Sequence, residues 1–285
     1  MQLLSTALIL LNARSVLSSC AHGTYLHRRA AGGEAIELPN FGYGPDDGPT
    51  NWHAISPDNM LCATGTCQSP ININGSIAQE PAGIVAMNVA AQDVKFENLG
   101  TNVEVVIAGT TMVNGREFVM EQFHFHTPSE HVINGEQFPA EVHMVHSAKD
   151  PDNPEEVAVI SLVIQATASD SVHSLDTVIS HISQIPTAGD SVDITQLDIS
   201  DIVTTVNALP MFTYTGSLTT PPCTEGVPFF ILAEAMPLHI DTVNALKAVV
   251  GHNARFLQQN IPAQENVLVA GSKALPDELV VGGTE

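Results

Sequence analysis

The chain has 285 residues, of which 44% are hydrophobic and 5% aromatic, a composition typical of a folded globular protein. Its 9 basic residues against 31 acidic ones give a formal net charge of -22. Such a chain offers no positive field to hold a phosphate backbone or an anionic membrane surface, so we expect no nucleic-acid partner and no binding to such membranes.

The first 29 residues have the pattern of a leader. Leu3–Leu11 is an apolar run of about signal-peptide length, too short to span a bilayer, and small residues follow at Ser19-Cys20-Ala21. Arg28-Arg29 is similar to a dibasic processing site. We predict a signal peptide and pro-segment over 1–29, secretion, and no membrane attachment after processing. The alternatives are an uncut leader and a bacterial lipoprotein with a lipid on Cys20.

The cysteines bear on the same question. Removal of the leader leaves three of them, Cys62, Cys67 and Cys223. In an oxidising compartment one pair should close and leave one thiol, which is either buried or joined to a second chain. Asn74 begins the only Asn-x-Ser/Thr sequon, so we predict glycosylation there if the chain is secreted.

Residues 30–262 contain no charge block or linker, so they are predicted to form one domain, followed by a mobile tail over 263–285. The periodicities predict, in chain order, strands over 103–107, 118–126, 140–147 and 157–165, a helix over 172–182, a strand over 229–233 and a helix over 242–250. Asp241 is the expected cap of the last helix. Many strands and only two helices indicate a mainly β (α+β) domain.

Alternating residues in the second of these strands bring two histidines together. On a strand of period two, His124 and His126 project from one face, and Phe123 and Phe125 from the other. The aromatic face indicates a buried strand, so the histidines on its other face need hydrogen-bond partners or a bound metal.

The next strand, over 140–147, places Glu141, His143 and Val145 on one face. If the two strands are neighbours, His124, His126 and His143 converge as three nitrogen ligands and leave a fourth position open, which is the design of a catalytic zinc site. The alternative is that these are ordinary core and surface histidines, satisfied by hydrogen bonds.

A second metal hypothesis uses Glu130. The spacing of His124, His126 and Glu130 also fits the first half of a cupin motif, in which the carboxylate would bind iron or manganese. The remainder of that motif is missing, since Phe118 stands where a glycine is required and no Gly/Pro turn precedes His143.

A series of motifs resembles the α-class carbonic anhydrases, over about residues 41–260. In order, the motifs are Phe41-Gly42-Tyr43-Gly44, Trp52, Gln68-Ser69-Pro70-Ile71-Asn72-Ile73, Gln122–His126 with Ser129-Glu130-His131, Glu141–His146, Tyr214–Cys223 and Asn253-Ala254-Arg255. The resemblance implies a single domain around a central twisted, mostly antiparallel sheet with short peripheral helices. It also implies reversible hydration of CO2 to bicarbonate by zinc-bound hydroxide, and a weak side activity on activated esters.

The resemblance also assigns roles. His124, His126 and His143 correspond to the Zn2+ ligands, and Thr219 to the residue whose hydroxyl donates to an ionised Glu130 and orients the attacking hydroxide. The residues that match the CO2 pocket are Val145, Val159, Leu218 and Val227. Thr220, Tyr43 and Asn102 match its polar wall, and Gln122, Glu141 and the backbone carbonyl of Asn253 match the groups that orient the ligands. His131 matches a structural position.

Cys62 and Cys223 match the disulfide of extracellular members, which anchors the loop that carries Thr219. Cys67 has no counterpart in that pairing, and a homodimer linked through it is a hypothesis. Pro70 and Pro222 match positions with cis peptide bonds.

Three positions depart from the family pattern. No histidine stands in 98–104, where fast members carry a proton-shuttle histidine, so proton release should depend on buffer or on another group at the rim. Phe41 and Phe229 each stand where tryptophan is common. The runner-up interpretation is a non-catalytic carbonic-anhydrase-like binding protein, but such proteins usually lack at least one of the three histidines, and all three are present here.

Overall fold

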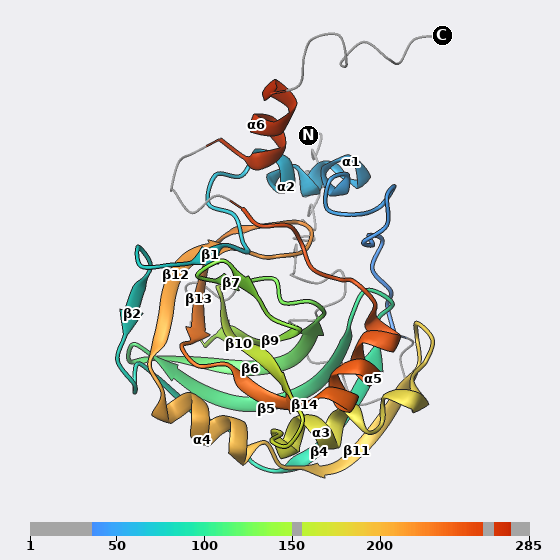
Figure 1. Ribbon diagram of the computed structural model, residues 1–285, viewed down its shortest axis with the longest axis vertical. Helices are drawn as coiled ribbons and strands as arrows, with labels where there is room; N and C mark the ends of the chain where they lie inside the picture. Colours follow the sequence, from blue (N-terminus) through green and yellow to red (C-terminus); the bar gives the residue numbers. More distant parts are fainter. Residues whose placement is uncertain (1–35, 150–155, 259–264, 275–285) are drawn as a thin grey trace, which may run out of the picture.

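The computed structural model describes residues 36–149, 156–258 and 265–274. The predicted leader, the dibasic site and the end of the predicted tail lie outside these residues. The described chain is dominated by one strongly twisted mixed sheet of 11 strands (Figure 1), which confirms the predicted fold class.

Nine strands of this sheet lie side by side. In spatial order they are β11 (Ser191–Leu197), β4 (Gln92–Asn98), β5 (Val103–Val113), β6 (Arg116–His126), β9 (Ala140–Ala148), β10 (Val157–Thr167), β13 (Glu225–Leu232), β12 (Met211–Ser217) and β2 (Ala78–Glu80). Two more strands join them, β3 (Val85–Asn88) on β5 and β14 (Met236–His239) on β10. Most pairs are antiparallel, whereas β10 runs parallel to β13 and β14. A second, small sheet contains β1 (Asn72–Ile73), β7 (Val132–Ile133) and β8 (Glu136–Gln137).

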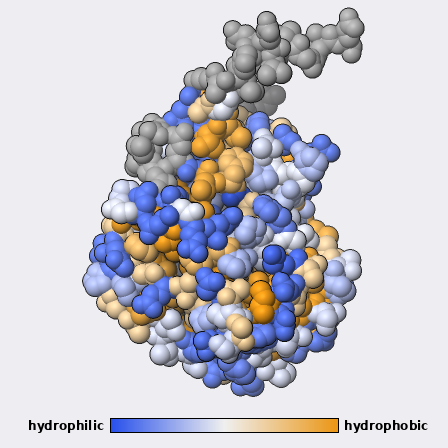
Figure 2. Space-filling view, in the orientation of Figure 1, coloured by the Kyte–Doolittle hydropathy of each residue, from blue (hydrophilic) through white to orange (hydrophobic). Residues whose placement is uncertain are grey.

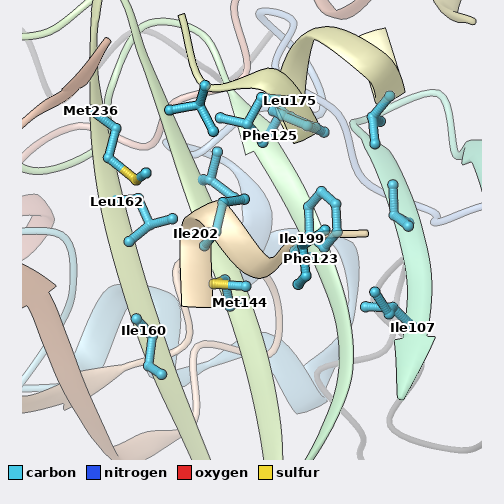
Figure 3. Packing of buried hydrophobic residues seen from close by; sticks show 14 of the residues in the cluster. Ile107, Phe123, Phe125, Met144, Ile160, Leu162, Leu175, Ile199, Ile202 and Met236 are labelled. Carbon is cyan, nitrogen blue, oxygen red and sulfur yellow. The ribbon is translucent and has the colours of Figure 1, made fainter. Parts of the chain in front are cut away.

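Three helices cover one face of the large sheet. They are α3 (His173–Ile179), α4 (Ser200–Ala208) and α5 (Ile240–Val250). Leu175 of α3 and Ile202 of α4 pack with Phe123, Phe125 and Met144 of the central strands in the largest apolar cluster (Figure 3). Because strand side chains alternate, the opposite face of the same strands is free for polar groups.

The remaining helical segments are short and lie mainly at the other end of the molecule in Figure 1. They are α1 (Trp52–Ile55), η1 (Pro57–Asn59), α2 (Leu61–Thr64), η2 (Ile182–Gln184) and α6 (Val267–Ala274). The face in Figure 2 is largely polar, and its apolar residues near the top lie over α6.

Two helix predictions need correction. The sequence indicated two helices, whereas the structure also has α1, α2, α4 and α6, the last within the segment predicted as a mobile tail. The cap of α5 is His239 and not Asp241, because the His239 Nδ1 accepts the backbone N–H of Asp241 at 3.2 Å. The expected cis bonds at Pro70 and Pro222 are present, together with a third at Thr127-Pro128.

Candidate active site

The three predicted ligands meet on the face of the sheet opposite the helices. His124 and His126 come from β6, and His143 lies directly across from His124 on β9. The Nε2 atoms of His124 and His126 are 3.1 Å apart, and no side chain of the three is more than 5% exposed. Two nitrogens bound to one tetrahedral zinc at about 2.0–2.1 Å lie about 3.3 Å apart, so this spacing fits zinc.

Each imidazole is held by a hydrogen bond at its outer nitrogen. The pairs are His124 Nδ1 with Gln122 Oε1 at 2.9 Å, His126 Nδ1 with the Asn253 carbonyl at 2.9 Å, and His143 Nε2 with Glu141 Oε1 at 2.7 Å. Since these acceptors take the outer N–H, the inner nitrogens carry the lone pairs. Burial lowers the pKa of all three imidazoles, which keeps them in the neutral form that binds a metal.

Glu141 is the most heavily hydrogen-bonded carboxylate of the site. Its Oε1 accepts from His143, His131 and Ser161, and its Oε2 accepts the backbone N–H groups of Glu130 and His131 at 2.8 and 2.7 Å. Burial favours the protonated form, but the neighbouring His131 and His143 and their hydrogen bonds hold the pKa of Glu141 well below its usual range. Glu141 is therefore ionised and acts only as an acceptor.

The predicted pair Glu130 and Thr219 is buried beside the ligands. Glu130 Oε2 lies 3.5 Å from His126 Nε2 and 3.9 Å from His143 Nδ1, and Glu130 Oε1 accepts the backbone N–H of Arg255 at 2.8 Å. Burial raises the pKa of Glu130 to about 7, while His143, the Thr219 hydroxyl and the Arg255 backbone N–H act to lower it. The Thr219 hydroxyl therefore lies close enough to this carboxylate to lower its pKa.

An apolar cluster lies next to these polar groups. It contains all four residues that were expected to form the CO2 pocket, Val145, Val159, Leu218 and Val227. Phe229 belongs to the same cluster, and its ring centroid lies 5.9 Å from that of His143. Of the predicted polar wall, Asn102 is buried, whereas Thr220 and Tyr43 are half-buried. The apolar side of the site is therefore built by residues far apart in the chain.

The loop that carries Thr219 is tied down by the predicted disulfide. Cys62 and Cys223 are bonded, across a sequence separation of 161 residues, and Cys67 is a free, half-buried thiol. The buried Arg255 stabilises the segment around Cys62, because its guanidinium donates hydrogen bonds to the carbonyls of Cys62 and Ser69 at 3.2 and 2.8 Å.

Two contributors to the site were not assigned a role from the sequence. Arg255 was only part of a motif, and Ser161 was one residue of a predicted apolar strand. Both could have been found as polar residues within segments that are otherwise buried, because a polar group that is removed from water needs a hydrogen-bond partner.

The comparisons with known proteins agree with this geometry. The family model described as "Eukaryotic-type carbonic anhydrase" matches residues 47–267. A carbonic anhydrase of Neisseria gonorrhoeae is 34% identical over 258 residues, covering 88% of this chain and 91% of its own. The solved α-carbonic anhydrase of Aspergillus oryzae has a TM-score of 0.77 and 38% identity, over 82% of this chain and 99% of its own.

A solved dioscorin complexed with ascorbate has a TM-score of 0.69 and 29% identity, over 77% of this chain and 94% of its own.

Within the described residues no helix has the length and apolar character needed to cross a membrane.

The matches to carbonic anhydrases remove the cupin interpretation of the histidine site. The chain belongs to the eukaryotic-type (alpha) carbonic anhydrase family and is a carbonic anhydrase.

Proposed function

We propose that this carbonic anhydrase works with Zn2+ held by His124, His126 and His143. The observation that carries the proposal is the convergence of three inner nitrogens while each outer nitrogen is held by its own acceptor. Three neutral imidazoles without a fourth protein ligand are the donor set of a catalytic zinc site. In carbonic anhydrases, zinc lowers the pKa of its bound water to about 7, a value known for the family, and so supplies hydroxide near neutral pH.

The chain's own residues then orient the reactants. The Thr219 hydroxyl donates a hydrogen bond to Glu130, so that only the lone pairs of the Thr219 oxygen remain to accept a hydrogen bond from the attacking group. CO2 is uncharged and donates no hydrogen bond, so it is suited to the apolar cluster of Val145, Val159, Leu218 and Val227. The half-buried hydroxyl of Thr220 lies at the next position to Thr219 and offers a polar contact for bicarbonate.

Secretion is supported by the closed Cys62–Cys223 disulfide, because disulfides persist mainly in oxidising compartments. At the sequon, Asn74 lies in a surface turn in which its Oδ1 accepts from the Ser76 backbone and hydroxyl at 3.0 and 2.7 Å. A secreted chain would present this turn for glycosylation. A homodimer through the free thiol of Cys67 stays a prediction, and a single monomer band on a non-reducing gel would contradict it.

The alternative is a binding protein without catalysis. The relative dioscorin, solved with ascorbate, makes ligand binding by this fold a second candidate. The retained set of three histidines, each with its supporting acceptor, favours catalysis.

Metal analysis tests the proposed zinc site. Wild-type protein should carry one zinc per chain after exhaustive dialysis and lose CO2 hydration and any esterase activity when a chelator removes the metal. A variant with all three histidines replaced by alanine should carry none. Zinc retained by that triple variant would refute the assigned ligand set.

A further inference from the structure

Ser161 is the single polar residue in the buried run Val157–Ile164 of β10. Its side chain is fully buried, at 0% exposure. The strand register sets Ser161 directly opposite His143 of β9, so both side chains lie on the active-site face. A buried hydroxyl is costly unless it is hydrogen-bonded, and this one donates to Glu141 Oε1 at 2.5 Å.

Glu141 Oε1 also accepts hydrogen bonds from His131 Nδ1 at 2.6 Å and from His143 Nε2 at 2.7 Å. A carboxylate oxygen has about two lone-pair sites, so three donors compete for it. The competition cannot be relieved through Oε2, because two backbone N–H groups already occupy that atom. The Ser161 hydroxyl therefore shares the same acceptor atom with the metal-site imidazole.

We infer that Ser161 is a positioning residue that weakens the hold of Glu141 on His143 and so tunes the strength of the metal site. The inference rests on the proposed zinc site. A carboxylate that orients a ligand raises its basicity, and hydrogen bonds that the same oxygen accepts from other donors reduce this effect. Without the Ser161 hydroxyl, His143 would receive the stronger acceptor, bind the metal more tightly and leave it a weaker Lewis acid.

The sign of this effect separates it from a purely structural role. If the Ser161 hydrogen bond only maintains the fold, its loss should loosen the site and speed zinc release. If Ser161 competes with His143 for Glu141 Oε1, its loss should slow zinc release. The two explanations therefore predict opposite changes for the same substitution.

The test compares full-length, zinc-loaded wild type with Ser161→Ala in excess chelator. We expect zinc release about threefold to tenfold slower in the variant, the effect of one hydrogen bond. In cobalt-substituted protein, the pH midpoint of the visible absorption band should move upward. The matched control is Ser174→Ala, which removes a hydroxyl that is 1% exposed and lies on α3, outside the site. Its zinc release should equal that of wild type.

Release that is unchanged or faster in Ser161→Ala would overturn the inference. If the alanine variant does not fold, Ser161→Cys provides a weaker donor of similar size, and release should again be slower than in wild type. These outcomes are separate from a failure of the proposed function. Wild type that does not retain zinc refutes the metal site itself, whereas zinc-bound, active wild type with a faster-releasing or unchanged Ser161→Ala refutes only the role of Ser161.

Discussion

His124 and His143 lie directly opposite each other on the antiparallel strands β6 and β9. Opposite residues project from the same face of a sheet, so this pairing brings together ligands that are 19 positions apart in the chain. A shift of one residue in the pairing would turn His143 toward the helices and break the site. Phe123 and Phe125 oppose such a shift, because they anchor the other face of β6 in the main core (Figure 3).

Replacing the acceptor that supports one ligand should weaken the metal site without removing a ligand. In Gln122→Ala, His124 loses the partner of its Nδ1, so we expect zinc affinity to fall about 10–100-fold in competition with a chelator. The exposed Gln79→Ala serves as the control. Equal affinities of the two variants would mean that Gln122 does not support His124.

The role of Thr219 depends on its hydroxyl. Thr219→Val keeps the shape of the side chain but removes the donor to Glu130, so kcat/KM for CO2 hydration should fall about 10²-fold with zinc content unchanged. Thr219→Ser keeps the hydroxyl and should retain most of the activity. A valine variant as fast as wild type would show that the Glu130 interaction does not orient the reaction.

Proton release should limit the rate at low buffer concentration. The segment 98–104 contains no histidine, so buffer should accept the proton instead. Stopped-flow rates at fixed pH and ionic strength should rise severalfold as the imidazole concentration increases. A flat dependence would contradict this prediction. His252 would then be the residue to replace, because it is exposed and lines a cavity of about 280 Å³ that also reaches Glu130 and Tyr43.

His146 should make the protein less stable in acid. Burial lowers the pKa of His146 to about 4, from an ordinary value of 6.5. As the pH falls below 6.5, the unfolded chain takes up a proton that the folded chain refuses, so stability is lost between about pH 6.5 and 4. This difference in pKa corresponds to about 3 kcal/mol at most.

Urea unfolding at pH 7 and pH 5 measures this effect. His146→Gln removes the titrating group and should show a smaller loss of stability between these two pH values than wild type. The exposed His173→Gln is the control and should behave as wild type. Identical pH dependence in all three proteins would exclude His146 as a source of the acid sensitivity.

The long strands were predictable because their alternation reflects a physical constraint, namely a core on one face and polar groups on the other. The helix α4 was missed, since Ile202, Val203, Thr204 and Thr205 are β-branched residues that favour strands, and tertiary packing against the sheet decides the outcome. The cap of α5 was assigned to Asp241 because aspartate is the common cap, whereas His239 fills that position.

At the site, the ligand strands followed from periodicity, but their pairing could only be assumed. The disulfide partner of Cys62 and the four residues of the apolar pocket came from family resemblance, because contacts between distant segments leave no local pattern. Ser161 is an example of a residue whose role depends on contacts that the local sequence does not show. The role of one serine in an apolar strand is ambiguous until the register places it opposite His143 and its hydroxyl is seen to donate to Glu141.

The most direct test of the catalytic metal site is CO2 hydration by stopped flow on the zinc-loaded protein, with and without an aromatic sulfonamide that takes the open metal position. If His124, His126 and His143 hold a catalytic zinc, hydration should be rapid and the sulfonamide should abolish it. Stoichiometric zinc without hydration would contradict the catalytic role of the site and favour the binding-protein alternative.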